Sequence, residues 1–163
     1  LRMPTVAAVN GVAAGAGSSL AMSCDIVVAA PAASFIQAFS KIGLIPDAGG
    51  TFLLAHRLGL ARATALAMTG DKLSAAQAKE WGVVWEVAED CVAAAEALAQ
   101  RLAAMPTQAL VRTRHLLRDA MTSSFEAQLQ AERDAQSALA KTHDYFEGVT
   151  AFLEKRAPVF KGA

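Results

Sequence analysis

Residues 9–20 read V-N-G-V-A-A-G-A-G-S-S-L, a glycine-rich turn that decides the fold of this chain. An apolar run over residues 5–9 enters the turn, and a second over residues 20–24 leaves it. This order predicts a buried strand, a tight connection and a short buried helix that begins near Ser18. The first N–H groups of a helix lack intrahelical partners, so those around Ala16 and Gly17 are expected to favour an anion. A tight connection without a ligand is the alternative, because the stretch lacks the spacing of a dinucleotide-binding turn.

Strands and helices alternate up to residue 49, and helices dominate beyond it. Strands are predicted over residues 26–30, 34–39 and 83–87, where short apolar runs are bounded by turn residues. Glycines and N-cap residues divide the rest into predicted helices at residues 50–58, 61–68, 74–82, 89–104, 106–120, 125–141 and 144–155. The alternation indicates an α/β fold rather than a helix bundle. The later helices carry more apolar stripes than the α/β half can cover, so some are expected to meet another subunit.

The composition is that of a globular protein without the charge pattern of a nucleic-acid binder. The 163 residues are 54% hydrophobic, and 15 Lys and Arg residues balance 15 Asp and Glu residues. Apolar runs are interrupted well before the ~20 residues that a membrane helix needs, so no membrane partner is expected. Cys24 and Cys91 stand in unrelated contexts, which predicts neither a disulfide framework nor a metal site and favours the cytoplasm. A small molecule or another protein is the expected partner.

The chain starts abruptly. Only four residues precede the first apolar strand. We therefore expect a chain that begins partway through a longer domain, with a natural terminus as the alternative.

A second glycine-bearing turn, over residues 43–51, reads G-L-I-P-D-A-G-G-T and contains one carboxylate, Asp47. Aspartate is favoured in turns and at helix N-caps, which gives Asp47 a purely structural interpretation. A functional interpretation rests on its apolar neighbours, Leu44 and Ile45. Apolar surroundings favour the protonated carboxyl group, and this would let Asp47 accept and return a proton near neutral pH.

Four segments resemble the crotonase (enoyl-CoA hydratase/isomerase) superfamily in their order and spacing. They read P-T-V-A-A-V-N-G-V-A-A-G-A-G-S-S-L-A-M-S-C-D-I-V-V-A, F-S-K-I-G-L-I-P-D-A-G-G-T, G-V-V-W-E-V and A-F-L-E-K-R-A-P-V-F-K-G. The resemblance covers the whole chain. It implies the C-terminal part of a ββα spiral over residues 1–104 and a helical trimerisation region over residues 105–163. It also implies homotrimers or hexamers built from two trimers, and acyl-CoA thioester substrates without a separate cofactor.

The resemblance assigns the first turn to an oxyanion hole. Ala16 matches the family's second oxyanion donor, a backbone N–H that holds the thioester oxygen while negative charge develops on it. Gly15 and Gly17 leave the backbone uncovered on either side, so the substrate carbonyl can approach closely. Losing one such donor costs on the order of 3 kcal/mol in a transition state. The family's other donor, and much of its CoA-binding surface, belong to an N-terminal segment outside these residues.

Two positions separate this chain from the hydratases of the family. The hydratases carry catalytic glutamates at the positions that match Ser19 and Phe39, and the pair activates the water that adds to the double bond. Neither serine nor phenylalanine supplies a carboxylate base, so efficient hydration is not expected. Ser19 and Phe39 are instead expected to line the substrate pocket.

Asp47 is the acid/base residue that the resemblance implies. A carboxylate at this position serves family members of the Δ3,Δ2-enoyl-CoA isomerase type and of the ring-1,2-epoxyphenylacetyl-CoA isomerase type of phenylacetate degradation. We therefore expect Asp47 to take a proton from one carbon of the acyl group and return it to another, with Leu44 beside it in the substrate pocket.

The C-terminal tail supplies the remaining candidates. Phe160 and Lys161 match a family tail that reaches the adenine and phosphates of CoA across the trimer, although a solvated basic end has the same composition. His56, His115 and His143 do not cluster in the sequence, so no metal site is predicted.

Three functions are left open by the sequence. The first is a CoA-thioester isomerase that shifts a double bond in fatty acid metabolism or rearranges a ring epoxide of a phenylacetyl-CoA derivative. The second is an enoyl-CoA hydratase (lyase) of the same superfamily, and the third is a truncated, non-catalytic trimerising module. Asp47 favours the first over the second, whereas only the abrupt start favours the third.

Overall fold

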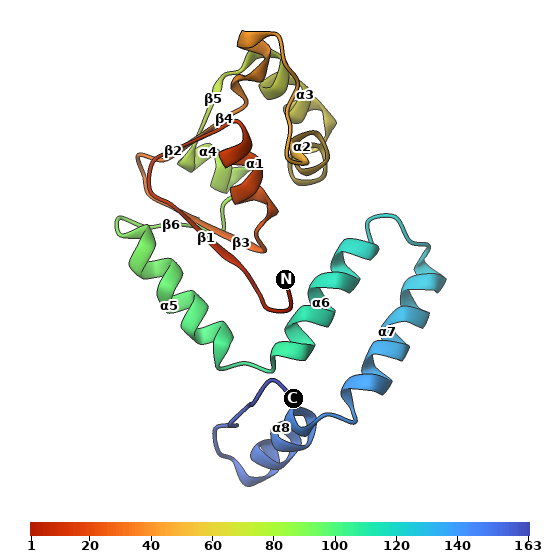
Figure 1. Cartoon of the computed structure of the whole chain (residues 1–163). Helices are drawn as coiled ribbons and strands as arrows, with labels where there is room; N and C mark the ends of the chain where they lie inside the picture. The colour runs from red at the N-terminus through yellow and green to blue at the C-terminus, as the bar shows by residue number, and fades with distance from the viewer. The chain divides into compact units, whose positions relative to one another are not determined.

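The computed structural model describes all 163 residues, which form two compact units (Figure 1). Thr5–Leu98 form one unit, here called the α/β unit. Leu1–Pro4 and Ala99–Ala163 form the other, here called the helical unit, so the division falls within helix α5 (Cys91–Ala103). The predicted α/β class with a helical C-terminal region is confirmed. The division into residues 1–104 and 105–163 concerns the family's domains and stays a prediction.

Two three-stranded sheets form the frame of the α/β unit. The first has the order β1 (Val6–Val9), β3 (Ile26–Ala29) and β6 (Glu86–Val87), and all three strands are parallel. The second has the order β2 (Val12–Ala14), β4 (Ser34–Ile36) and β5 (Lys72–Ser74), in which β2 and β4 are parallel and β5 is antiparallel to β4. Since β1 and β2 are consecutive but belong to different sheets, Asn10 and Gly11 carry the chain from one sheet to the other.

One apolar core joins the sheets to the helices of the α/β unit. The helices are α1 (Ala16–Ser23), α2 (Gly50–Leu58), α3 (Leu60–Thr69) and α4 (Ala75–Glu80). Core side chains come from all these layers and include Met22, Val27, Phe35, Leu54 and Leu73. Burying one side chain of this size contributes roughly 1.5–3 kcal/mol, so the core fixes how the turns between these elements are presented.

The structure corrects several predicted elements. Helix α1 begins at Ala16 rather than near Ser18, because Gly15 has φ 53° and ψ −124°, a conformation that glycine adopts easily, and ends β2 immediately before the helix. The strand predicted over residues 34–39 ends at Ile36, and the 3₁₀ helix η1 (Ala38–Ile42) follows it. The strand predicted over residues 83–87 is reduced to β6. Strands β2 and β5 are too short to show a periodic pattern and escaped prediction.

Three helices close to the predicted ranges make up most of the helical unit: α6 (Thr107–Asp119), α7 (Phe125–Leu139) and α8 (His143–Glu154). Helices α7 and α8 begin with side-chain N-caps, because the Ser124 hydroxyl accepts the N–H of Ala127 and the Thr142 hydroxyl accepts the N–H of Tyr145. None of the helices in the chain combines the length and the apolar character needed to cross a membrane.

Candidate active site

The first turn of α1 begins at the surface of the α/β unit. Ala16 is the first residue of the helix, and both it and Gly17 are exposed. The preceding residue, Gly15, donates its own N–H to the carbonyl oxygen of Ile36 at 2.8 Å. Because the first N–H groups of a helix have no intrahelical acceptor, the N–H of Ala16 can meet a negatively polarised oxygen, and its role as an oxyanion donor stays a prediction.

Phe39 closes the space behind this turn. A Cβ atom on Gly15 would lie only 3.3 Å from Cζ of the Phe39 ring. The ring comes from η1 and is partly buried. The structure thus brings Gly15, Ala16 and Phe39 together, and glycine is required at the first position by both its φ angle and this contact.

Beneath the turn lies a group of buried polar side chains. Ser18 and Ser19 are fully buried, and Gln37 is 3% exposed. Nε2 of Gln37 donates to Oγ of Ser18 at 3.2 Å, whereas Oε1 of Gln37 and Oγ of Ser19 are buried without a hydrogen-bond partner in the chain. Each such unpaired group costs about 1–3 kcal/mol, and polar groups kept at this cost often belong to functional sites. Since Ser19 is enclosed, its role as a substrate contact stays a prediction.

Asp47 lies in the turn between η1 and α2. Its carbonyl oxygen accepts the N–H of Gly50 at 2.7 Å, but its exposed carboxylate makes no hydrogen bond or ion pair within the chain. The N-cap of α2 is Gly49, with φ 77° and ψ 9°, so the interpretation of Asp47 as an N-cap is wrong. The Asp47 side chain is therefore not occupied by a structural task.

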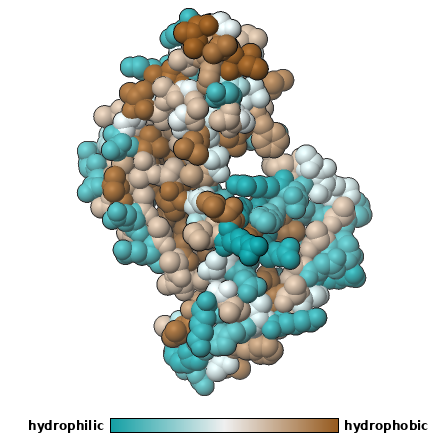
Figure 2. Space-filling model, in the orientation of Figure 1, coloured by the Kyte–Doolittle hydropathy of each residue, from teal (hydrophilic) through white to brown (hydrophobic).

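The apolar neighbours of Asp47 are exposed as well. Ile42, Leu44 and Ile45 are 71%, 60% and 77% exposed and form a surface here called the η1 patch. In Figure 2 apolar residues gather at the top of the view, where Figure 1 places η1. Leu44 and Ile45 therefore do not bury the Asp47 carboxylate in the apolar surroundings that the sequence predicts.

The two turns meet at Gly50. A Cβ atom on Gly50 would lie 2.6 Å from Oγ of Ser19 and 3.1 Å from Cβ of Pro46. Ser19 belongs to α1, while Pro46 directly precedes Asp47. Gly50 thus permits close packing of the turn that carries Asp47 against the helix whose first N–H is that of Ala16. The sequence pattern predicted the two turns separately but not this contact.

The C-terminal tail belongs to the helical unit, where it is attached to α8. Asp144, which is 4% exposed, accepts the backbone N–H groups of Lys161 and Gly162 at 2.8 Å each. Burial acts to raise the pKa of Asp144, but these N–H groups, together with His143, lower it below its usual value. The tail is therefore a held segment rather than a loose solvated end, although the Lys161 side chain itself is exposed.

A second carboxylate holds the middle of the tail. Oε1 of Glu147 accepts hydrogen bonds from Nη1 of Arg156 at 2.6 Å and from the backbone N–H of Val159 at 2.8 Å. The Arg156 guanidinium and the Val159 N–H lower the pKa of Glu147 to about 2. Both partners of Glu147 precede Phe160, so they help to place its ring.

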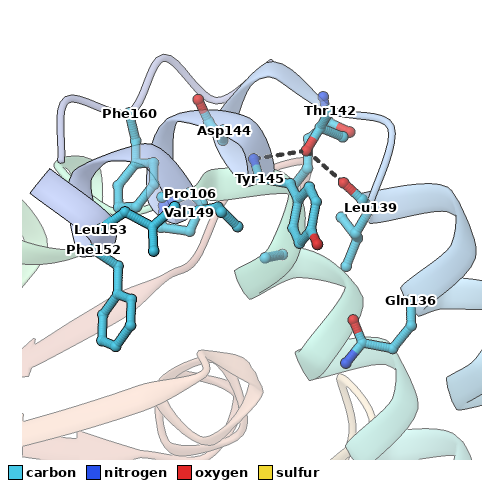
Figure 3. Close-up of a pocket in the computed structure, with 13 residues that line it drawn as sticks. Pro106, Gln136, Leu139, Thr142, Asp144, Tyr145, Val149, Phe152, Leu153 and Phe160 are labelled. Carbon is cyan, nitrogen blue, oxygen red and sulfur yellow. Dashed lines mark hydrogen bonds between the residues drawn. The ribbon is translucent and has the colours of Figure 1, made fainter.

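Phe160 lines an apolar groove of about 410 Å³ in the helical unit (Figure 3). Its ring lies over Gly148 of α8, where a Cβ atom would be 3.5 Å from the ring. Pro106, Tyr145, Val149 and Phe152 also line the groove. Phe160 thus packs in an apolar groove of its own chain. Contact of Phe160 or Lys161 with a ligand stays a prediction.

The remaining candidates make local contacts. His56 stacks on Phe52 with ring centroids 3.8 Å apart, and Nδ1 of His143 lies 3.4 Å from Oδ1 of Asp144. No three His, Cys, Asp or Glu side chains in the chain are grouped so that they could hold a metal ion. Gln37 and Gly50 were not predicted as residues of the site. The sequence marks Gln37 only as one polar residue inside the apolar run F-I-Q-A-F over residues 35–39.

Comparison with known families gives a match along the entire chain. The family described as enoyl-CoA hydratase/isomerase matches residues 1–163. A 1,2-epoxyphenylacetyl-CoA isomerase of Escherichia coli is 51% identical, with 99% of this chain and 63% of that protein covered. A probable enoyl-CoA hydratase of Rhodobacter capsulatus is 43% identical, with 98% and 63% covered. The chain therefore spans slightly less than two thirds of the length of these relatives.

Solved structures confirm the predicted fold. A putative enoyl-CoA hydratase/isomerase from Mycobacterium abscessus superposes with a TM-score of 0.97 at 38% identity, covering 99% of this chain and 63% of that chain. An enoyl-CoA hydratase from a Polaromonas species superposes with a TM-score of 0.94 at 40% identity, covering 98% and 63%. Both similarities span the α/β and the helical unit, so the crotonase-type architecture extends over the described residues.

Proposed function

The chain belongs to the enoyl-CoA hydratase/isomerase family, and from this premise we propose that it carries the proton-transfer residue and one oxyanion donor of an acyl-CoA thioester isomerase. One observation carries the proposal: the unengaged carboxylate of Asp47 lies on a turn that packs, through Gly50, against the helix that begins at Ala16. By the family resemblance, Ser19 and Phe39 stand where the hydratases carry their catalytic glutamates, which supports isomerisation over hydration. The relative named as an isomerase supports the same choice.

The proposed reaction moves one proton within the acyl group. The thioester oxygen accepts the Ala16 N–H and a second donor, so the proton at C2 of a 3-enoyl-CoA becomes more acidic. The Asp47 carboxylate takes this proton, and the electron pair of the C–H bond spreads over a dienolate whose charge lies largely on the thioester oxygen. The Asp47 carboxyl group then returns the proton to C4, which leaves the double bond between C2 and C3. One side chain serves both steps, and no water is consumed.

The surroundings of the acyl group are assigned on the same basis. Gly15 and Gly17 let the thioester approach the backbone, and Phe39 and Leu44 contact the acyl chain. Ser19 stands below the turn, at the position of a hydratase glutamate. The Leu44 side chain is 60% exposed, so it is accessible to a ligand.

The nucleotide end of the substrate is assigned to the tail. Phe160 and Lys161 contact the adenine and phosphates of CoA, which enters as part of the substrate, and no separate cofactor takes part. The hydrogen bonds of Asp144 support this assignment, because they hold the tail in one conformation while the Lys161 side chain is exposed. A phosphate can then be bound without ordering a flexible segment.

The acyl group, the assembly and the location complete the proposal. The substrate is an enoyl-CoA of fatty acid metabolism or a ring epoxide of a phenylacetyl-CoA derivative from phenylacetate catabolism. The complete protein forms a homotrimer or a hexamer in the cytoplasm, binding neither nucleic acid nor membrane. Exposed apolar side chains on the helical unit, such as Phe125 and Phe152 at 74% and 82%, support burial against another subunit.

A substrate comparison tests the proposed reaction. The complete protein is offered a 3-enoyl-CoA, a 2-enoyl-CoA and a phenylacetyl-CoA ring epoxide, and the products are separated and weighed by mass spectrometry. We expect isomers of unchanged mass from the 3-enoyl-CoA or the epoxide. A water adduct of the 2-enoyl-CoA as the main product would instead identify a hydratase, and no product from any of the three would favour a non-catalytic module.

A further inference from the structure

Gln37 is a buried polar residue to which the proposed reaction gives no task. It is 3% exposed and stands between β4 and η1, with φ −98° and ψ 73°. Its Nε2 donates to Oγ of Ser18 at 3.2 Å, and its Oε1 has no partner within the chain. Burying an amide that satisfies only part of its hydrogen-bonding capacity is unfavourable, so its presence needs an explanation.

The start of α1 lacks the usual means of holding a helix N-terminus. Its N-cap residue, Gly15, has no side chain to accept the N–H of the second or third helical residue. Glycine also leaves the backbone free to adopt several conformations. The peptide group that carries the Ala16 N–H is held within the helix by one bond, in which the Gly15 carbonyl oxygen accepts the N–H of Ser19 at 3.2 Å, and contacts from outside the helix restrain it further.

Two consecutive residues, Ile36 at the end of β4 and Gln37 directly after it, supply this further restraint. The carbonyl oxygen of Ile36 accepts the N–H of Gly15, one residue before Ala16. The Gln37 side chain reaches Ser18, two residues after Ala16, in the same first turn. The register of β2 and β4, which pairs Ala14 with Ile36, aligns both contacts. Ala16 is thus held on both sides by a single segment.

We propose that Gln37 is a positioning residue that orients the Ala16 N–H for the thioester oxygen through its hydrogen bond to Ser18. The inference rests on the proposed function of Ala16 and deepens it by adding the residue that sets the donor's direction. Gln37 itself touches no reacting atom. Its effect is on the polarisation of the bound carbonyl, not on the affinity for the rest of the substrate.

The test uses variants of the complete protein. Gln37→Met keeps an unbranched side chain of similar length but cannot donate, and Ser18→Ala removes the acceptor. The double variant closes a mutant cycle, in which two residues that act through one shared bond show non-additive effects. Gln100→Met is the matched control, because Gln100 is exposed on α5. If Gln37→Met fails to fold, the smaller change Ser18→Ala carries the test.

Two readouts separate positioning from a structural role. The first is the absorption band of a bound dimethylaminocinnamoyl-CoA, which moves to longer wavelength as the thioester carbonyl is polarised by hydrogen-bond donors. The second is the division of any loss between kcat and KM, measured with a 3-enoyl-CoA. Thermal unfolding is recorded in parallel, since a merely structural residue changes Tm and leaves both readouts of the folded enzyme unchanged.

The expected result is a smaller spectral shift and a roughly tenfold lower kcat in Gln37→Met and in Ser18→Ala, with KM nearly unchanged and no further loss in the double variant. Gln100→Met should match the wild type. Wild-type shift and kcat in both single variants, or losses that add in the double variant, would overturn the inference and leave the proposed function intact. A wild-type protein that neither shifts the band nor isomerises the substrate would overturn both.

Discussion

In the helical unit the buried carboxylate of Asp144 accepts two backbone N–H groups, whereas in the α/β unit Ser19 Oγ and Gln37 Oε1 are buried without partners. The first arrangement repays the cost of burying a polar group and secures the tail. The second leaves the desolvation cost of Ser19 Oγ and Gln37 Oε1 without a compensating hydrogen bond, beneath the turn that carries Ala16. Unpaired buried atoms are not confined to the α/β unit, since Oε1 of Gln128 in the helical unit is one as well. What distinguishes Ser19 and Gln37 is their place beneath the turn that carries Ala16.

The glycines of the α/β unit extend the comparison. Gly15 and Gly50 each stand where a Cβ atom would be crowded, at 3.3 Å from Phe39 and 2.6 Å from Ser19 respectively. Both contacts lie at the two turns that carry Ala16 and Asp47. In the helical unit a Cβ atom on Gly162, in the tail, would lie 3.3 Å from Oγ1 of Thr107 in α6, and one on Gly148 would make only an ordinary contact with Phe160, at 3.5 Å.

The largest expected effect comes from Asp47→Asn. The amide cannot accept a proton, so kcat for a 3-enoyl-CoA should fall about 10²- to 10⁴-fold. Stability should stay within about 0.5 kcal/mol of the wild type, because the side chain is exposed and unpaired. Steady-state kinetics and urea unfolding check both expectations. Asp71→Asn, a change at another exposed aspartate of the α/β unit, is the control and should retain full activity.

The next effect is expected from Gly15→Ala. A side chain at φ 53° is strained and would meet Phe39, so the first turn of α1 should shift and the Ala16 N–H should no longer face the thioester oxygen. We expect kcat to fall about 10²- to 10³-fold, the usual loss for one oxyanion donor. Gly82→Ala also places alanine at positive φ, 82°, but in open space. An equal loss of activity in both variants would show that strain, not donor geometry, is responsible.

A smaller effect concerns the packing of the two turns. Gly50→Ala should lower the free energy of unfolding by roughly 1–3 kcal/mol, since the new methyl group overlaps Ser19 Oγ. Removing that hydroxyl with Ser19→Ala should restore part of the loss, a coupling that denaturant melts of both single variants and the double variant would measure. Strictly additive changes would contradict the contact.

The smallest effect is expected in the helical unit and depends on pH. The pKa of Glu147 is lowered from a usual value of 4.5 to about 2, so its ionised form favours the attached tail at pH values above 4.5. That contribution should be lost as the pH falls from about 4.5 towards 2, as the carboxylate becomes protonated and releases Arg156 and Val159. The amide NMR signal of Val159 should follow this titration.

A control variant sharpens the pH prediction. Glu147→Gln should place the Val159 signal near its acid position at every pH, because the charge-assisted bond to Arg156 is gone. Glu132→Gln, on the exposed surface of α7, should leave the titration unchanged. If the amide chemical shift of Val159 in the wild type does not change with pH, Glu147 does not hold the tail in solution.

Much of the fold follows from local rules in the sequence. Gly49, Gly59 and Gly70 end or begin helices at positive φ, so the bounds of α2 and α3 agree closely with the predicted ranges. Ser74 and Ser124 cap α4 and α7 as expected. These signals are carried by one or two neighbouring residues, and for that reason no tertiary information is needed to interpret them.

The parts that escaped prediction depend on contacts between distant residues. Strand β2 exists because Ala14 pairs with Ile36, and β5 exists because Leu73 pairs with Phe35. Gln37 becomes informative only when it reaches Ser18, and Gly50 only when it meets Ser19. Asp47 and Ala16 were predicted because their turns have recognisable residue patterns, and their roles came from the family resemblance. The support beneath them has no such local pattern.

Proton transfer by Asp47 is tested most directly by isomerising a 3-enoyl-CoA in ²H₂O. If Asp47 delivers the proton to C4 of a dienolate, any deuterium taken up at the new saturated carbon must appear at C4, with no oxygen added to the acyl chain. NMR and mass spectrometry of the product locate the label. We expect a 2-enoyl-CoA in which deuterium is found at C4 to the extent that the Asp47 carboxyl group exchanges its proton with solvent between the two steps. A product with a hydroxyl group at C3 and deuterium at C2 would contradict proton transfer by Asp47.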